Sequence, residues 1–208
     1  SSDLLVQIPL LVALVTGDLV SGEAAMGTIR MLATKPISRV QLLLSKFIAG
    51  GIYTLIVILW MGIMSVLVGK MLFGTGDMMV LNSDGLVILQ EADVNWRYLG
   101  GFAVAFLALF TVSSLSICLS CFTDNSIGPI VATMSVILLF TIIGTLDVRV
   151  FDPIKPYLFT THMAAWRSFF EDPLPLSAIW RSVGVLVAHN VVLISVSLYT
   201  FHRKDIQS

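Results

Sequence analysis

The most informative property of this sequence is how little charge it carries. Only 12% of its 208 residues are Asp, Glu, Lys or Arg, whereas 57% are hydrophobic, and the mean hydropathy is +0.94. A soluble domain usually has about 25% charged residues, so this chain lacks the polar side chains needed to cover a surface in water. The deficit excludes an ordinary soluble protein and predicts an integral membrane protein.

Two further scarcities narrow the class of protein. The net charge of −1 provides no basic surface for nucleic acid. The two cysteines, Cys118 and Cys121, are too few and too close for a disulfide framework. No other residue able to bind metal lies near them in the sequence, so we interpret them as small packing residues rather than a redox or metal site.

Five segments are apolar enough to cross a bilayer as helices, which is the natural form of a chain in lipid. A hydrocarbon core of about 30 Å needs about 20 such residues. The predicted spans are residues 4–20, 47–69, 98–119, 127–146 and 183–201. We therefore predict an all-α bundle forming one transmembrane domain over residues 1–208.

The connections between these spans predict the orientation of the chain. The loop 21–39, the join at 123–126 and the tail 202–208 fall on one side, and the long loops 70–97 and 147–182 fall on the other. Basic residues are denser on the first side, which the positive-inside rule places in the cytoplasm. We expect a multi-pass protein of the cell (inner) membrane with a cytoplasmic C-terminus. Five spans would then leave Ser1 outside, so a sixth, upstream helix is expected.

The sequence contains no recognisable motif for converting energy, either by binding nucleotide or by coupling to an ion. The segments Gly69-Lys70 and Gly74-Thr75-Gly76 lack the spacing of a phosphate-binding loop. The last four predicted spans contain no Asp, Glu, Lys or Arg, the groups on which ion-coupled transporters usually depend. We therefore expect no catalytic residue and no cofactor in this chain.

Residues 22–35 are predicted to form a short amphipathic helix after the first span. A polar stripe of Glu23, Gly27, Arg30 and Thr34 has helical spacing. Pro36 would end this helix, Ser38 can cap the next one, and Arg39 and Lys46 can anchor that next helix at the headgroups. An amphipathic helix of this kind lies along the membrane interface.

The same stretch resembles the permease subunits of type-2 ATP-binding-cassette transporters, which are mostly bacterial exporters. After their second span these permeases show an acid, Glu, Gly-Thr, Leu, Pro, Arg and Lys in that order. The residues that match here are Asp18, Glu23, Gly27-Thr28, Leu32, Pro36, Arg39 and Lys46. The layout of spans also agrees along essentially the whole chain.

The resemblance implies that residues 22–35 form a coupling helix that docks on a separate cytosolic ATPase. It assigns charged contacts to Glu23, Arg30, Lys35 and Arg39, with Gly27 and Thr28 permitting close approach. It also implies a second permease chain, identical or different, and ATP with Mg bound by the partner ATPase. The alternative is that these charges only hold an interfacial helix at the headgroups.

Two interpretations of the whole chain remain open. The first is an exporter permease that moves cargo across or out of the membrane. The second is a membrane scaffold that transmits the ATPase stroke to an extracytoplasmic partner and transports nothing itself.

Other polar features have structural and functional interpretations. His189 and Asn190, inside the last span, either line a pathway or hydrogen-bond a neighbouring helix. The aromatic run 157–170 is predicted to be an amphipathic helix on the outer leaflet. The acids of 70–97 are interpreted as a solvated loop, and Ser113, Ser114 and Ser116 with Gly100 and Gly101 indicate close helix packing, with the dimer seam as one location.

Overall fold

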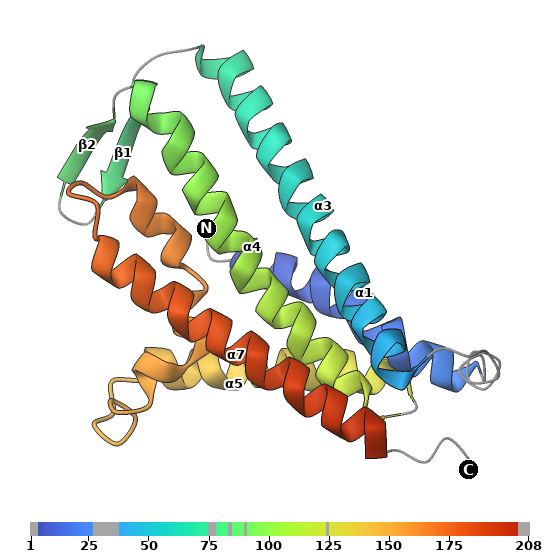
Figure 1. Cartoon of the computed structure of the whole chain (residues 1–208). Coiled ribbons are helices and arrows are strands. Elements are labelled where there is room, and N and C mark those ends of the chain that lie inside the picture. The colour runs from blue at the N-terminus through green and yellow to red at the C-terminus, as the bar shows by residue number, and fades with distance from the viewer. Residues whose placement is uncertain are drawn as a thin grey trace.

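A computed structural model describes residues 4–26, 38–74, 78–82, 85–89, 91–123 and 125–203. The chain is predominantly helical in these ranges, with one small hairpin (Figure 1). The long helices are α1 (Leu4–Ala25), α3 (Arg39–Phe73), α4 (Glu91–Ser120), α5 (Ile127–Thr145) and α7 (Leu176–Arg203). The short elements are β1 (Met78–Asn82), β2 (Gly85–Leu89), η1 (Lys155–Tyr157), α6 (Phe159–His162) and η2 (Ala165–Phe170).

Four of these helices are long and apolar enough to cross a membrane. Within the described residues they are the segments Val40–Leu72, Asp93–Ser120, Ile127–Thr145 and Leu176–His202. The predicted class, a helical membrane protein, is thereby confirmed. The predicted first span, 4–20, lies within the 22 residues of α1.

Several helices extend beyond the ends predicted from hydropathy. α3 begins at Arg39 rather than at 47, because Ser38 forms a capping box with Gln41. The Ser38 side chain accepts the Gln41 N–H, and the Ser38 N–H donates to Gln41 Oε1, both at 3.2 Å. The predicted cap at Ser38 is therefore confirmed. At the other end α3 stops at Gly74, whose φ of 78° is a conformation that glycine adopts without strain.

The segment 70–97 was predicted to be a solvated acidic loop. The prediction of a loop is wrong, because most of the segment has regular secondary structure. It contains the end of α3, the antiparallel pair β1–β2 and the first turns of α4 (Figure 1). The register pairs Met78 with Leu89 and Asn82 with Gly85. Two runs of apolar residues on either side of a polar turn favour a hairpin over a loop.

α4 is the central helix of the bundle. More than half of its apolar window, 56%, is buried, against 17% for each of the three other candidate spans. It packs against α1, α3, α5 and α7 and against η2. Its residues Ala108 and Val112 lie in one core cluster with Val12 of α1 and Leu186 of α7. Movement of any long helix therefore has to be accommodated by α4.

The last turns of α1, α4 and α7 and the first turns of α3 and α5 gather at one end of the molecule (Figure 1). A second core cluster lies there and joins Val20 of α1, Leu43 of α3, Ile117 of α4 and Phe201 of α7. This end also carries the two ends of the chain segment that was predicted to contain the coupling helix.

Candidate functional site

The predicted site falls only partly within the described residues. Gly27, Thr28, Arg30 and Lys35 lie outside them, as does the side chain of Arg39, the first residue of α3. Glu23 is described and lies in the last turn of α1, which runs without a break to Ala25. The prediction that a separate helix begins at residue 22 is therefore wrong, because residues 22–25 continue the apolar helix before them.

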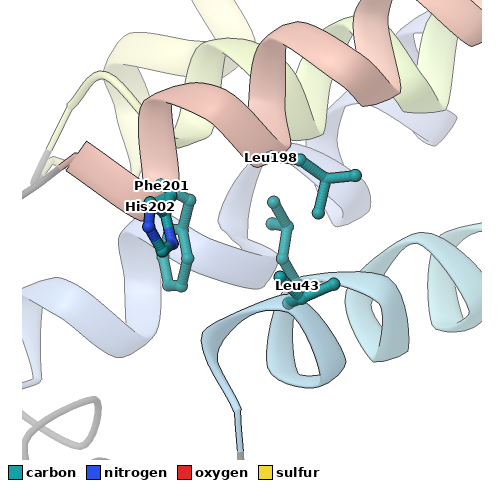
Figure 2. A pocket seen from close by; sticks show the side chains of 5 residues that line it. Leu43, Leu198, Phe201 and His202 are labelled. Atoms are coloured by element: carbon teal, nitrogen blue, oxygen red, sulfur yellow. The ribbon is translucent and has the colours of Figure 1, made fainter.

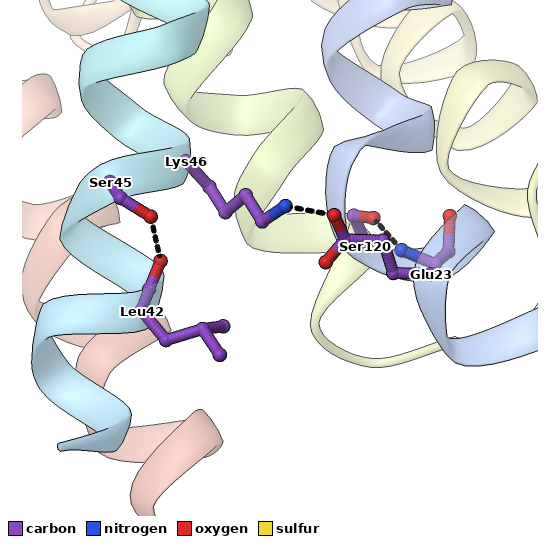
Figure 3. A network of polar contacts seen from close by, with 6 residues as sticks. Glu23, Leu42, Ser45, Lys46 and Ser120 are labelled. Carbon is purple, nitrogen blue, oxygen red and sulfur yellow. Dashed lines mark hydrogen bonds and ion pairs between the residues drawn. The ribbon is translucent and has the colours of Figure 1, made fainter. Parts of the chain in front are cut away.

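Glu23 forms an ion pair and a hydrogen bond with Lys46 of α3 (Figure 3). Their side chains are 29% and 15% exposed, so water screens this pair less than it screens a surface pair. The sequence predicted Lys46 as an anchor at the headgroups but gave no sign of its partner. The contact joins the end of α1 to the start of α3, the two helices that flank residues 27–37.

Serine side chains of α4 tie the same end of α1 to the centre of the bundle. Ser120 Oγ accepts the Ser21 N–H at 2.8 Å (Figure 3). The same hydroxyl donates to the Gly17 carbonyl at 2.7 Å. One turn earlier, Ser116 Oγ donates to the Ala13 carbonyl at 3.0 Å. Because these bonds reach the α1 backbone, α1 and α4 are held in register as well as in contact.

Glycine allows this close approach of the helices. A Cβ placed on Gly17 would lie 2.9 Å from Ser116 Oγ and 3.0 Å from an Ile130 side-chain carbon. A Cβ on Gly50 of α3 would lie 2.6 Å from Ser113 Oγ. Small residues at helix crossings are typical of membrane bundles, where helices associate by packing. The predicted close packing of the α4 serines is therefore present, and it is packing within this chain.

At the same end α7 closes against α3. Figure 2 shows Leu43 of α3 facing Leu198 of α7, with Phe201 and His202 beside them. Together with Val40 these side chains line a shallow apolar pocket. Cys118 and Cys121 are buried nearby in and just after α4, at 4% and 1% exposure, and Cys121 is part of the second core cluster. Their burial agrees with the packing interpretation.

Asn190 of α7 fastens α7 to the middle of α4. Its Oδ1 accepts the Ser114 hydroxyl at 2.7 Å, and its Nδ2 donates to Thr111 Oγ1 at 2.8 Å and to the Leu186 carbonyl at 2.9 Å. It is 6% exposed. His189 is half-buried, bonds the Val185 carbonyl through Nδ1 and packs against Phe159. Of the two interpretations of this pair, the helix-to-helix bond describes Asn190.

At the opposite end of α4 lies the segment 157–170, called the outer segment after its predicted side of the membrane, and it is not the single amphipathic helix that was predicted. It forms α6 and the 3₁₀ helix η2, and η2 packs flat on α4. A Cβ on Gly100 would lie 2.3 Å from the Phe169 ring, so the aromatic side chains fit against bare backbone there. The Gly100 position belongs to this contact within the chain rather than to a dimer seam.

Arg97 locks this arrangement. Its guanidinium is 7% exposed and donates through Nη1 to the carbonyls of Phe169, at 3.2 Å, and Glu171, at 2.8 Å. Hydrogen bonds from a charged donor to carbonyl oxygens are stronger than those from a neutral donor. Sequence reasoning did not single out Arg97; its position next to the Gly100-Gly101 pair was the available signal.

These features define the class of protein: a helical membrane protein whose central helix is hydrogen-bonded to its neighbours at both ends. The chain belongs to the family described as "Protein of unknown function (DUF2705)", whose model matches residues 1–207. It is also similar to the "Uncharacterized protein YhcI" of Bacillus subtilis (strain 168), with 36% identity over 83 residues, which are 38% of this chain. The match spans about a quarter of that relative, 26% of its length.

Proposed function

We propose that this chain is the membrane-spanning permease subunit of an ATP-binding-cassette exporter, in which α1 is a fifth spanning helix. The proposal rests first on the residues that resemble the permease pattern, from Asp18 through Glu23 and Pro36 to Lys46. In this proposal residues 22–35 contact a cytosolic ATPase, which binds ATP and Mg. The cytoplasmic side is then the end at which α1, α4 and α7 finish.

The observation that carries the proposal is the way the flanks of residues 27–37 are joined. Glu23 and Lys46 pair across them, and Ser120 bonds the last turns of α1 to α4. A force applied to the segment between α1 and α3 would therefore act on two helices together. It would pass from them into α4, which packs against every other long helix.

These contacts favour a segment that transmits movement to the spans over one that only holds the chain at the headgroups. An ATPase that closes on nucleotide would displace the segment, and the spans would move as packed bodies between inward-facing and outward-facing states. Such motion needs stiff connections at the point of force, and an ion pair with backbone-directed hydrogen bonds provides them. Because one chain supplies half of a pathway, we propose two permease chains and two ATPase chains.

The first experiment tests association with the ATPase. The chain is co-expressed with a candidate cassette ATPase from the same organism and recovered from detergent by affinity capture. Reversal of charge at Arg30 (Arg30→Glu) should abolish recovery of the ATPase while leaving insertion in the membrane unchanged. Unchanged association together with normal transport would remove the coupling role.

A matched control is available at the other end of the molecule. Lys155→Glu makes the same change of charge at a half-buried lysine, which pairs with Asp152 at 2.8 Å in the outer segment. Recovery of the ATPase with Lys155→Glu and its loss with Arg30→Glu would localise the contact. Equal loss in both variants would indicate a general effect of charge on folding.

The rival function, a scaffold acting on an extracytoplasmic partner, is favoured by one observation. The outer end carries a hairpin, β1–β2, and a segment held by Arg97. Both could be displaced by a conformational change that the ATPase drives. Purified complex in liposomes separates the two functions. Cargo movement driven by ATP supports the exporter, whereas hydrolysis without transport supports the scaffold.

A further inference from the structure

His162 lies at the junction of three elements on the outer side of the bundle. It is the last residue of α6 and is 8% exposed. Its Nε2 lies 2.9 Å from the Pro156 carbonyl oxygen of η1, and its Nδ1 lies 2.9 Å from Ser182 Oγ of α7. Ser182 Oγ in turn lies 2.9 Å from the Ala178 carbonyl oxygen. The outer segment is thus joined to α7 through one imidazole and one hydroxyl.

The number of protons in this chain of contacts depends on the charge of the imidazole. The two carbonyl oxygens can only accept, so three hydrogen bonds require three protons on Nε2, Nδ1 and Oγ. A neutral imidazole and a hydroxyl supply two protons, and an imidazolium and a hydroxyl supply three. All three contacts are therefore hydrogen bonds only when His162 is protonated.

In the neutral form one contact is lost. Nε2 must keep the proton, because the Pro156 carbonyl accepts. The Ser182 hydroxyl then either donates to Nδ1 and leaves Ala178, or donates to Ala178 and leaves two lone pairs facing each other. In the protonated form each N–H has an acceptor, which offsets the cost of burying the charge.

No acidic side chain bonds His162 within the described residues. α6 packs against α4, α5, α7 and η1. The charged or titratable groups that these elements carry toward the outer end are Lys155 and Tyr157 of η1, Glu91, Asp93, Arg97 and Tyr98 of α4, and Arg181 and His189 of α7; α5 has none. Asp93 is exposed and accepts the indole N–H of Trp96. Lys155 pairs with Asp152, Arg97 bonds backbone carbonyls, and Arg181 is exposed. Within the described part of the chain, His162 bonds only Pro156 and Ser182.

From this geometry we infer that His162 is a proton-responsive latch, which fastens the outer segment to α7 more tightly when the imidazole is charged. Imidazole gains its proton between about pH 5 and pH 8. Acidification outside the cell would therefore strengthen the docking of residues 156–162 on α7. The inference is independent of the proposed transport function, because it uses only contacts within this chain.

The test compares thermal unfolding of the full chain in lipid nanodiscs from pH 5.5 to pH 8. The extra bond exists only in the protonated, folded form, so its contribution is present at acidic pH and is lost as the pH rises. The wild-type Tm should fall across this range by about 2–4 °C relative to Ser182→Ala and to His162→Gln. Ser195→Ala is the matched control: its hydroxyl also bonds a carbonyl of α7, that of Val191 at 2.7 Å, and it makes no contact with a histidine within the described residues.

A second measurement needs no variant to fold. Nitrogen-15 spectra of the labelled histidine should show a neutral His162 with the proton on Nε2 at pH 8, and protons on both nitrogens at pH 5.5. A neutral ring with its proton on Nδ1 at pH 8, or a ring still neutral at pH 5.5, would overturn the latch. So would a pH dependence of Tm that is identical in wild type, Ser182→Ala and His162→Gln.

Discussion

The hydroxyl of Ser114 in α4 donates to the side-chain oxygen of Asn190 in α7, and both side chains are buried between the two helices. Ser114 is fully buried and Asn190 is 6% exposed. The orientation of the amide is fixed by its neighbours, because the Leu186 carbonyl can bond only the nitrogen. This relationship decides how substitutions at Asn190 should act.

Asn190→Ala should destabilise the fold rather than alter the specificity of transport. It removes two bonds between helices, each worth about 0.6 kcal/mol on average in a membrane bundle. We expect a loss of about 1 kcal/mol, which corresponds to a fall in Tm of about 2–4 °C in detergent. Ser135→Ala, which removes an exposed hydroxyl bonded only to the Val131 carbonyl, should leave Tm nearly unchanged. A changed cargo preference with an unchanged Tm would contradict the structural role.

The Glu23–Lys46 pair predicts that swapping the two charges is tolerated, whereas giving both positions the same charge destabilises the protein. Glu23→Lys and Lys46→Glu each place like charges together at a partly buried contact. The loss should lie between the 0–1 kcal/mol of an exposed pair and the roughly 3–5 kcal/mol of a buried one. The double variant should recover most of the Tm. If the double variant is as unstable as either single one, the two side chains do not interact in the way described.

The same variants separate stability from coupling. A double variant that folds but no longer stimulates the proposed ATPase would assign Glu23 a contact with that partner beyond its pairing with Lys46. Full recovery of both stability and stimulated hydrolysis would restrict Glu23 to holding α1 against α3. The measurements are Tm and ATP hydrolysis by the purified complex.

Two glycines of α3 should respond in opposite ways to alanine. Gly50→Ala adds a carbon 2.6 Å from Ser113 Oγ and 3.0 Å from the Ile117 side chain, so α3 and α4 must separate. Overpacking of this kind costs about 1–3 kcal/mol. Gly69→Ala meets nothing within 4 Å and should stabilise the helix by about 0.5–1 kcal/mol. Equal effects on Tm would show that the two helices do not approach closely at Gly50.

Arg97 predicts how the outer segment is held. Arg97→Ala removes the donor to the carbonyls of Phe169 and Glu171. The 3₁₀ helix η2 should then detach from α4 more often, and residues 165–175 should be cut faster by protease added to the protein in detergent. Arg149→Ala, at an exposed arginine just after α5, serves as the control for loss of charge. Cleavage at the same rate in both variants would mean that the Arg97 bonds do not restrain the segment.

Hydropathy predicted which parts of the chain are long apolar helices but not where those helices end. The apolar span begins at 47, eight residues after the first residue of α3, Arg39, because hydropathy reports where lipid is favoured. The start of the helix itself was indicated by the predicted cap at Ser38. The hairpin was missed although Asp84-Gly85 was present as a turn signal. Four acids in the loop outweighed that signal in our interpretation.

The sequence predicted which polar residues share a buried helix face, but it did not predict which helices they bond. Ser113, Ser114 and Ser116 were identified as close-packing residues, but they bond different neighbours: Ser114 bonds Asn190 of α7, and Ser116 bonds α1. Periodicity identifies a buried face and does not name the helix that covers it. For the same reason Lys46 was predicted without Glu23, and Arg97 without the outer carbonyls.

The length of α3 has a consequence for the membrane that surrounds it. At about 1.5 Å per residue, the 35 residues of this helix measure about 52 Å, well above a hydrocarbon thickness of about 30 Å. Even a tilt of about 40°, the upper end of the usual range, leaves about 40 Å along the bilayer normal. The distal turn, with Met71 at 83% and Leu72 at 71% exposure, is then left above the acyl chains. The uncharged part of α3 between Lys46 and Lys70, 23 residues or about 35 Å, matches the hydrocarbon core with a tilt in the usual range. The extra turns at the two ends of α3 therefore lie beyond the acyl chains.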